Sequence, residues 1–248
     1  MTDLIAIDDT FGSFVTLRQG FGEDDDAPWE IPVRVFLAKL DGANVLVDAG
    51  VGPAGGGSFM PDRQGRLVDE LGRHGVSPDD VDLVVFTHLH VDHIGWAVVD
   101  GEPFFRNARY VAHADDFAYF ASPEADALDL RDQLDALRRG GRAEAVDRDG
   151  EIHPGVALVH LPGHTPGHCA VELAGAFVIG DAAVDPRQVA DPARWFFAEV
   201  DRALAARTRR RLFEELADAE TLVASPHFAT PFGRIRRDGD GFAWTPAD

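Results

Sequence analysis

The chain has 248 residues, of which 45% are apolar, and 43 acidic against 23 basic residues give it a net charge of −20. This length suits a single domain over residues 1–248 with a sizeable buried core. Such an acidic surface repels phosphate backbones and argues against nucleic acid as a partner, and no run of about 18 apolar residues predicts a membrane span. The lone Cys169 excludes an internal disulfide, and the start of the chain lacks a signal peptide's apolar region, so we expect a cytoplasmic protein.

The first third of the chain is predicted to be mainly β-structure. From apolar patterning and turn residues we expect a β-rich entry at 4–17, in which 14–17 is the best strand candidate. Further strands are expected at 33–40, 44–48 and 81–86, and a helix at 64–74. An Asp-Gly pair is typical of a two-residue hairpin turn between the second and third of these strands. The third strand ends on Asp48, which is either a loop cap or part of a buried site.

The segment that follows the 81–86 strand carries the strongest chemical signal. It reads Thr87-His88-Leu89-His90-Val91-Asp92-His93. His88 and His90 are two residues apart, so an extended backbone projects both to the same face. Asp92 and His93 follow where the chain must turn. Imidazole and carboxylate are ligands that borderline divalent metals prefer, so this spacing predicts a metal site rather than a chance cluster of histidines.

The middle of the chain is predicted to be mainly helical. A short helix is expected at 94–99, a strand at 110–112 and an amphipathic helix at 123–139, which basic residues and then glycines close. His113 lies after the strand and is interpreted as structural.

The second half repeats the β-rich pattern. We expect strands at 156–161, 171–173, 176–179, 221–224, 233–237 and 242–244, and a helix at 201–219. The 207–211 segment of that helix is rich in arginine and is interpreted as a solvated or salt-bridged face. Three further candidates lie at strand ends: the turn from Gly163 to His168, Asp181 after a glycine, and His227.

These motifs, in this order from Asp48 to His227, resemble the metallo-β-lactamase fold superfamily. The resemblance implies an α/β fold, the αβ/βα sandwich of two mixed β-sheets with helices on the outer faces. It also implies a set of metal ligands, namely His88, His90, Asp92, His93, His164, Asp181 and His227. In the family pattern Asp181 is shared between two metals. Asp48 and His168 would support the ligands from outside, with the reverse assignment of His164 and His168 as the alternative.

The resemblance further implies the chemistry. Two divalent metal ions are expected, with zinc as the default and iron, manganese or cobalt as alternatives. Such a pair lowers the pKa of water toward neutrality and makes hydroxide available as the nucleophile. Asp92 and Asp181 are the candidate catalytic residues, with Asp92 passing a proton to the leaving group.

Within the superfamily the chain is most similar to dinuclear acyl-homoserine lactonases and methyl-parathion-type hydrolases. We therefore expect hydrolysis of a lactone or ester, or of a phosphotriester, in a small neutral substrate, with no nucleic-acid or membrane partner and with a homodimer allowed. One departure concerns Val184, since many acyl-homoserine lactonases carry a tyrosine three residues after the bridging aspartate. The expected pocket residues, for which ordinary core packing is the competing interpretation, are Trp96, Phe117, Val184, Trp195 and Phe228.

Two other activities use similar ligands. A glyoxalase II-like thioesterase would need a basic patch for the carboxylates of glutathione, and the sequence shows no clear one. A mononuclear iron persulfide dioxygenase-like oxidoreductase is compatible with the ligand types. A flavodiiron protein would also need a flavin domain.

Overall fold

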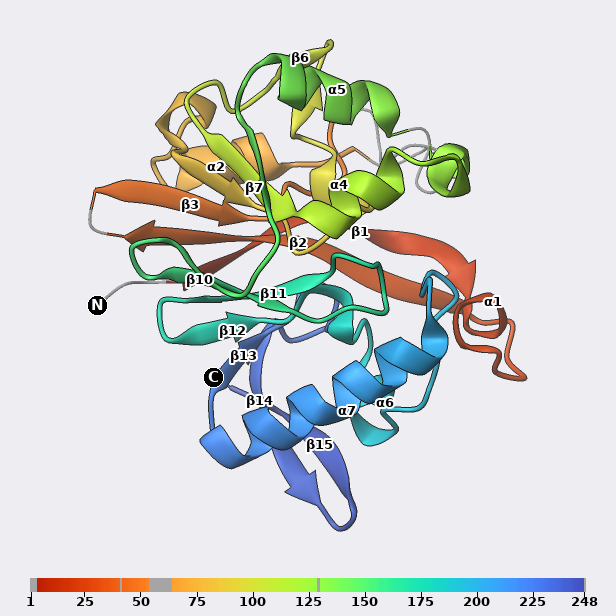
Figure 1. Ribbon diagram of the computed structural model, residues 1–248. Coiled ribbons are helices and arrows are strands. Elements are labelled where there is room, and N and C mark those ends of the chain that lie inside the picture. Colours follow the sequence, from red (N-terminus) through yellow and green to blue (C-terminus); the bar gives the residue numbers. More distant parts are fainter. Residues whose placement is uncertain (1–3, 41, 54–63, 129, 248) are drawn as a thin grey trace. The chain divides into compact units, whose positions relative to one another are not determined.

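The computed structural model describes residues 4–40, 42–53, 64–128 and 130–247 (Figure 1). The chain forms two compact units that are interleaved in sequence. The first unit comprises Met1–Phe11 and Val33–Arg148, and the second comprises Gly12–Pro32 and Asp149–Asp248. Among the described residues, no helix is both long and apolar enough to cross a membrane. That residues 1–248 form a single domain stays a prediction.

A six-stranded mixed sheet contains most strands of residues 4–146, apart from the separate pair β5 (Val98–Val99) and β6 (Glu102–Pro103). Its order is β1-β2-β3-β4-β7-β8. The bounds are β1 (Leu4–Thr16), β2 (Pro28–Leu40), β3 (Ala43–Val47), β4 (Leu83–Val85), β7 (Arg109–His113) and β8 (Ala143–Val146). β2 and β3 are antiparallel with Leu40 opposite Ala43, which confirms the predicted hairpin. β3, β4, β7 and β8 run parallel, so the residues after β3 and after β4 emerge at the same edge of the sheet.

Helices of the first unit pack against this sheet through leucines and aromatic residues (Figure 1). The remaining elements are α2 (Leu67–Arg73), η2 (Pro78–Asp80), α3 (Val91–Ile94), β5 (Val98–Val99), β6 (Glu102–Pro103), α4 (Ala114–Phe120), η3 (Pro123–Leu128) and α5 (Arg131–Arg139). The predicted helix at 123–139 is two pieces, η3 and α5. α4 was not predicted.

The predicted helix at 94–99 is wrong. The helix lies earlier, as α3, and Val98–Val99 instead pairs with Glu102–Pro103. Asp100 and Gly101 connect them with positive φ angles of 53° and 80°. An Asp-Gly pair with both residues in this conformation is a tight hairpin turn, and β-branched valines favour the strand.

A seven-stranded sheet forms the second unit, in the order β15-β14-β13-β12-β11-β10-β9. The bounds are β9 (Gly150–His153), β10 (Val156–His160), β11 (Cys169–Leu173), β12 (Ala176–Val178), β13 (Leu222–Ala224), β14 (Phe232–Asp238) and β15 (Gly241–Pro246). β12 and β13 are parallel, and the other neighbouring strands of this sheet are antiparallel. The turns after β10 and β12 and the turn after β13 carry the predicted site residues.

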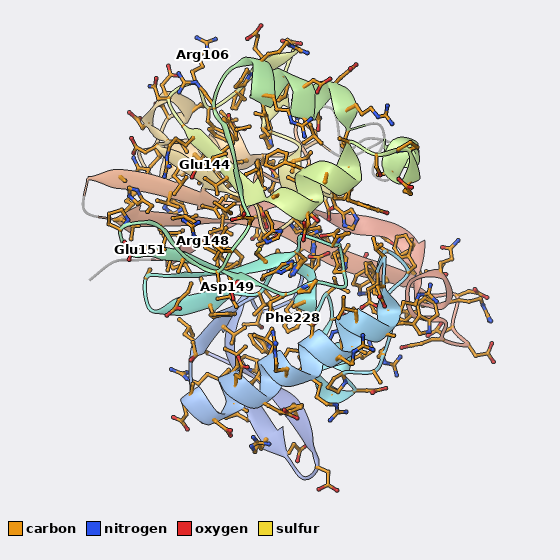
Figure 2. All side chains as sticks on the ribbon, in the orientation of Figure 1. Arg106, Glu144, Arg148, Asp149, Glu151 and Phe228 are labelled. Atoms are coloured by element: carbon orange, nitrogen blue, oxygen red, sulfur yellow. The ribbon has the colours of Figure 1, made fainter. Side chains whose placement is uncertain are left out.

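In its described part, the second unit contains three short helices and one long helix. They are α1 (Leu17–Phe21), η4 (Gly180–Ala182), α6 (Pro186–Ala190) and α7 (Arg202–Ala219). Leu212, Phe213 and Leu216 of α7 pack in one cluster with apolar residues of β14 and β15. Phe228, labelled in Figure 2, lies in the same cluster. In the 207–211 segment, interpreted as a solvated or salt-bridged face, Arg209 is only 1% exposed and pairs with Glu199, so it is salt-bridged and not solvated.

Candidate metal centre

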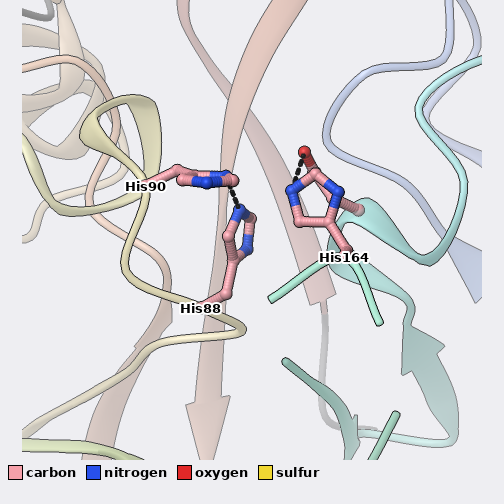
Figure 3. Close-up of side chains that lie close together, drawn as sticks. His88, His90 and His164 are labelled. Atoms are coloured by element: carbon pink, nitrogen blue, oxygen red, sulfur yellow. Dashed lines mark hydrogen bonds and ion pairs between the residues drawn. The ribbon is translucent and has the colours of Figure 1, made fainter. Parts of the chain in front are cut away.

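The first group of predicted ligands lies in the loop after β4 and in α3. His88 Nε2 and His90 Nδ1 lie 2.9 Å apart, and the two rings meet edge to face (Figure 3). The Nδ1 atom of His88 lies 3.1 Å from the hydroxyl of Thr87, on the far side of the ring. His88 therefore presents Nε2, and His90 presents Nδ1, to the same point in this unit.

Asp48 holds the third histidine of this group. Its Oδ2 atom lies 2.8 Å from Nδ1 of His93, and both residues are almost fully buried. A buried carboxylate at Nδ1 favours the tautomer with the proton on that nitrogen, so Nε2 keeps the lone pair that a metal needs. Nε2 of His93 in turn lies 3.7 Å from Oδ2 of Asp92. The arrangement supports Asp48 as a residue that orients a ligand.

The backbone fixes Asp48 in this position. Asp48 has a φ of +66°, and its carboxylate accepts hydrogen bonds from the backbone N–H (2.7 Å) and the hydroxyl of Thr87. The loop after it also bonds to α3, since Ala49 N donates to His93 O at 2.6 Å. A non-glycine residue in the left-handed region persists only where its surroundings determine it. The loop after β3 and the ligand helix are therefore one hydrogen-bonded assembly.

Asp9 is a residue that the sequence interpretation missed. It is fully buried and accepts hydrogen bonds from Val51 N (2.7 Å), Leu67 N (2.8 Å) and Trp96 Nε1 (3.1 Å). Burial raises the pKa of this carboxyl group. Trp96 lies shortly after α3, so Asp9 ties the region behind the ligands to the loop after Asp48. Only its position in a strand was visible in the sequence.

The second group of predicted ligands lies in the second unit and centres on Asp181. Oδ2 of Asp181 lies 3.3 Å from Nε2 of His164, and Oδ1 lies 3.1 Å from Nε2 of His227. The two oxygens of one carboxylate thus face two different imidazoles. All three residues are buried, at 2% to 5% exposure.

The two imidazoles of this group are held by different contacts. Nδ1 of His227 lies 2.8 Å from the carbonyl oxygen of Pro32, so Nε2 is left with the lone pair. The ring of His164 stacks on Phe196 with an interplanar angle of 10°. These contacts fix the direction of each ring relative to the carboxylate.

His168 has a different environment from His164. The backbone N–H of Asp181 donates to its Nε2 at 3.0 Å, and its Nδ1 lies 3.2 Å from the carbonyl oxygen of Leu161. Both ring nitrogens therefore contact backbone groups, which is the pattern of an imidazole that holds a turn. This favours the assignment of His164 rather than His168 as the ligand.

The predicted pocket residues lie in packed surroundings. Trp96 and Phe117 belong to the core of the first unit, while Phe228 packs on Trp244 and Val184 is 1% exposed. Trp195 is half-buried, with the guanidinium of Arg202 over its ring. Their role in a substrate pocket stays a prediction.

The donor chemistry of both groups fits divalent metal ions. Each group combines imidazoles with a carboxylate, and all of these residues except His90 and Asp92 are buried. In His93 and His227, a hydrogen bond fixes Nδ1 on the side away from the neighbouring ligand. Buried imidazole and carboxylate donors are those that zinc and related metals prefer. A carboxylate with one histidine at each oxygen is also the arrangement expected of a shared ligand.

The family model described as the metallo-beta-lactamase superfamily matches residues 29–227. N-acyl homoserine lactonase AiiB of Agrobacterium fabrum (strain C58 / ATCC 33970) is 28% identical in an alignment of 240 positions that covers 86% of this chain and 85% of that protein. An N-acyl homoserine lactonase of Bacillus cereus is 26% identical in an alignment of 218 positions that covers 79% of this chain and 81% of that protein.

Solved structures share the fold. AidC, a dizinc quorum-quenching lactonase, has a TM-score of 0.88 at 20% identity, over 100% of this chain and 95% of its own. The hydrolase AbOPH has a TM-score of 0.82 at 21% identity, over 100% of this chain and 94% of its own. These similarities confirm the predicted fold class, and together with the family match they confirm a metal-dependent hydrolase. The chain belongs to the metallo-β-lactamase superfamily.

Proposed function

We propose that the chain is a dinuclear metal-dependent hydrolase that opens the lactone or ester bond of a small neutral substrate. The observation that carries the proposal is the Asp181 carboxylate, whose two oxygens face His164 and His227. A carboxylate placed between two imidazoles suits a ligand shared by two metals. The ligand set of the two units is proposed to be His88, His90, Asp92, His93, His164, Asp181 and His227.

Zinc is the metal that the donor set and the dizinc neighbour favour. When bound, two divalent ions polarise the scissile carbonyl and make hydroxide available near neutral pH. The residues of the chain orient the centre: Asp48 holds the proton on Nδ1 of His93, and the carbonyl of Pro32 does the same for His227. The carboxylate of Asp92, 18% exposed, is proposed to carry a proton to the leaving oxygen.

The substrate class rests on the relatives and on charge. Two curated relatives are named N-acyl homoserine lactonases, which favours a lactone. The net charge of −20 opposes the approach of polyanions such as nucleotides or glutathione conjugates. Val184 stands where many such lactonases have tyrosine, so we expect acyl-homoserine lactones to be modest substrates. The cytoplasmic location and a homodimer stay predictions.

Metal analysis combined with a substrate panel tests the proposal. Protein purified without chelator should contain two metals per chain, and kcat/KM should be higher for neutral lactones and esters than for S-lactoylglutathione or a phosphotriester. A hundredfold preference for the glutathione thioester would replace the lactonase proposal with a thioesterase. A single iron per chain and consumption of oxygen with a persulfide would replace it with an oxygenase.

A further inference from the structure

Arg209 is a fully buried cation in the second unit. Its Nε donates to the carbonyl oxygen of Ala182 at 2.5 Å, and its Nη1 donates to the carbonyls of Pro192 and Arg194 at 2.9 Å each. Nη2 forms a buried ion pair with Glu199. A guanidinium is costly to bury, and it persists only when its donors and its charge all have partners. The contacts of Arg209 meet this requirement through four different residues.

The first of these contacts reaches the Asp181 turn, residues Gly180–Ala182. Ala182 directly follows the proposed shared ligand, so its carbonyl oxygen is part of the same turn. Two residues after that turn, the backbone N–H of Val184 donates to the side chain of Gln188 at 2.8 Å. Gln188 donates in turn to Glu199, the partner of Arg209, at 3.3 Å. One buried network therefore contacts the backbone after Asp181 at two points.

The same helix also holds the His164 turn, residues 162–168. Thr208, the neighbour of Arg209 in α7, donates its hydroxyl to the carbonyl oxygen of Pro162 at 2.9 Å. One turn earlier, a Cβ added to Gly163 would lie 2.3 Å from the backbone nitrogen of Ala205, so the turn and helix are in direct contact. Just before the helix, Val200 N and Asp201 N donate to the carbonyls of His164 and Gly163, both at 2.9 Å.

A small pocket lies where these contacts meet. Its lining includes His164 and Asp181 from the two turns and Ala205, Thr208 and Arg209 from α7. The helix thus contributes one wall of the space next to two proposed ligands. Neighbouring hydroxyl and guanidinium donors of one rigid helix bind the backbones of two ligand-bearing turns.

We propose that Arg209, together with Thr208, is a positioning residue that fixes the distance between the Asp181 carboxylate and the His164 imidazole. This inference rests on the proposed function, in which both side chains bind metal. The ligands are then held in place before metal arrives, and metal binding need not order the two turns. Residues that orient ligands from outside typically change metal affinity or activity by about 10–100-fold when they are lost.

The test uses Arg209→Lys in the full-length protein. Lysine keeps the charge that Glu199 needs but lacks the planar fork that reaches several carbonyls at once. Arg210→Lys, an exposed position on the same helix, is the matched control. We expect Arg209→Lys to bind cobalt(II) and zinc(II) at least about tenfold more weakly in competition with a chelator. The visible spectrum of the cobalt form should change, and kcat should fall more than KM rises.

A purely structural role would give a different result. It would lower the melting temperature of the metal-free protein and leave the cobalt spectrum and affinity of the folded fraction unchanged, which would overturn the inference. If Arg209→Lys fails to fold, Thr208→Val tests the inference instead. This variant removes the hydroxyl that donates to Pro162, and we expect it to bind cobalt more weakly than the wild type. Unchanged binding in Thr208→Val would overturn the inference. A wild-type protein that binds no cobalt would instead overturn the proposed function, and the inference with it.

Discussion

The two groups of proposed ligands are built in different ways. In the first unit the four ligands lie within six consecutive residues, on one loop and the short helix that follows it. In the second unit the three ligands come from three turns, at residues 164, 181 and 227. The first group needs support from one neighbouring loop, through Asp48. The second needs a helix, α7, to hold separate turns together.

This difference indicates which substitutions should disturb the geometry of each ligand group. A contiguous ligand segment keeps its geometry through local backbone hydrogen bonds, such as His93 N to His90 O at 3.0 Å. Ligands on separate turns keep their geometry only through tertiary contacts, since no local bond links them. Variants in the second unit should therefore disturb metal binding more than equivalent variants in the first.

Asp181→Ala should have the largest effect. The variant removes both carboxylate oxygens that face His164 and His227, so it should hold one metal or none and lose more than about 100-fold in activity, beyond the usual cost of losing an orienting residue. Elemental analysis and kcat/KM measure this. Asp191→Ala, at an exposed position in the same unit, is the control. An unchanged metal content in Asp181→Ala would contradict the shared-ligand role.

His164→Ala and His168→Ala should separate a ligand from its support. His164→Ala should lose metal and nearly all activity, because its Nε2 faces the carboxylate. His168→Ala removes the acceptor of the Asp181 backbone N–H and should keep metal with about 10–100-fold lower affinity. Chelator competition distinguishes the two. The reverse order of effects would show that the assignments are exchanged.

Asp48→Asn tests the support of the first group. Asparagine tolerates the φ of +66° but cannot present a carboxylate to Nδ1 of His93, so metal affinity should fall by about tenfold, the lower end for such residues. Asp82→Asn, at an exposed position in the same unit, is the control. A loss larger than that of His168→Ala would reverse the proposed difference between the two units.

Asp9→Asn should have the smallest effect on metal and a pH-dependent effect on stability. Burial raises the pKa of Asp9 in the folded protein above its usual value near 3.8, so the folded state binds the proton more tightly than the unfolded state. The contribution of this group is greatest below that value and falls as pH rises through the raised pKa. The stability loss in Asp9→Asn should therefore be larger at about pH 4 than at pH 7.

Denaturant unfolding of the metal-free protein, followed by circular dichroism at both pH values, gives this comparison. Metal-free protein is needed because bound metal would be released as its ligands are protonated at low pH, which would add a separate pH dependence to the stability. A loss that is equal at both pH values would show that the carboxyl group titrates alike in the folded and unfolded states.

The ligands could be predicted from the sequence because they follow strands with a clear apolar pattern. The segment from His88 to His93 is recognisable by spacing alone, and Asp181 and His227 follow strands that the pattern located. Edge strands with fewer apolar residues, β8 and β9, were missed, as was α4. Each of these two strands has only four residues, which is too short for a clear alternating pattern.

The supporting residues could not be predicted. Arg209 lies among other arginines and is distinguished only by burial, which depends on Glu199 and on the chain around Ala182. Asp9 lies in a strand whose buried partners are more than 40 residues away. Such roles depend on tertiary contacts between distant segments, and a local pattern contains no information about them.

The interleaving of the two units affects how the chain can fold during its synthesis. Residues 12–32 are synthesised early but belong to the unit whose other residues are 149–248. During translation this segment must wait for partners such as Phe196 and His227, whereas residues 33–148 find most of theirs earlier. A gene cut after residue 148 would place the 12–32 segment in the wrong fragment. The two pieces, expressed separately, should each be incomplete and should fold productively only when both are present.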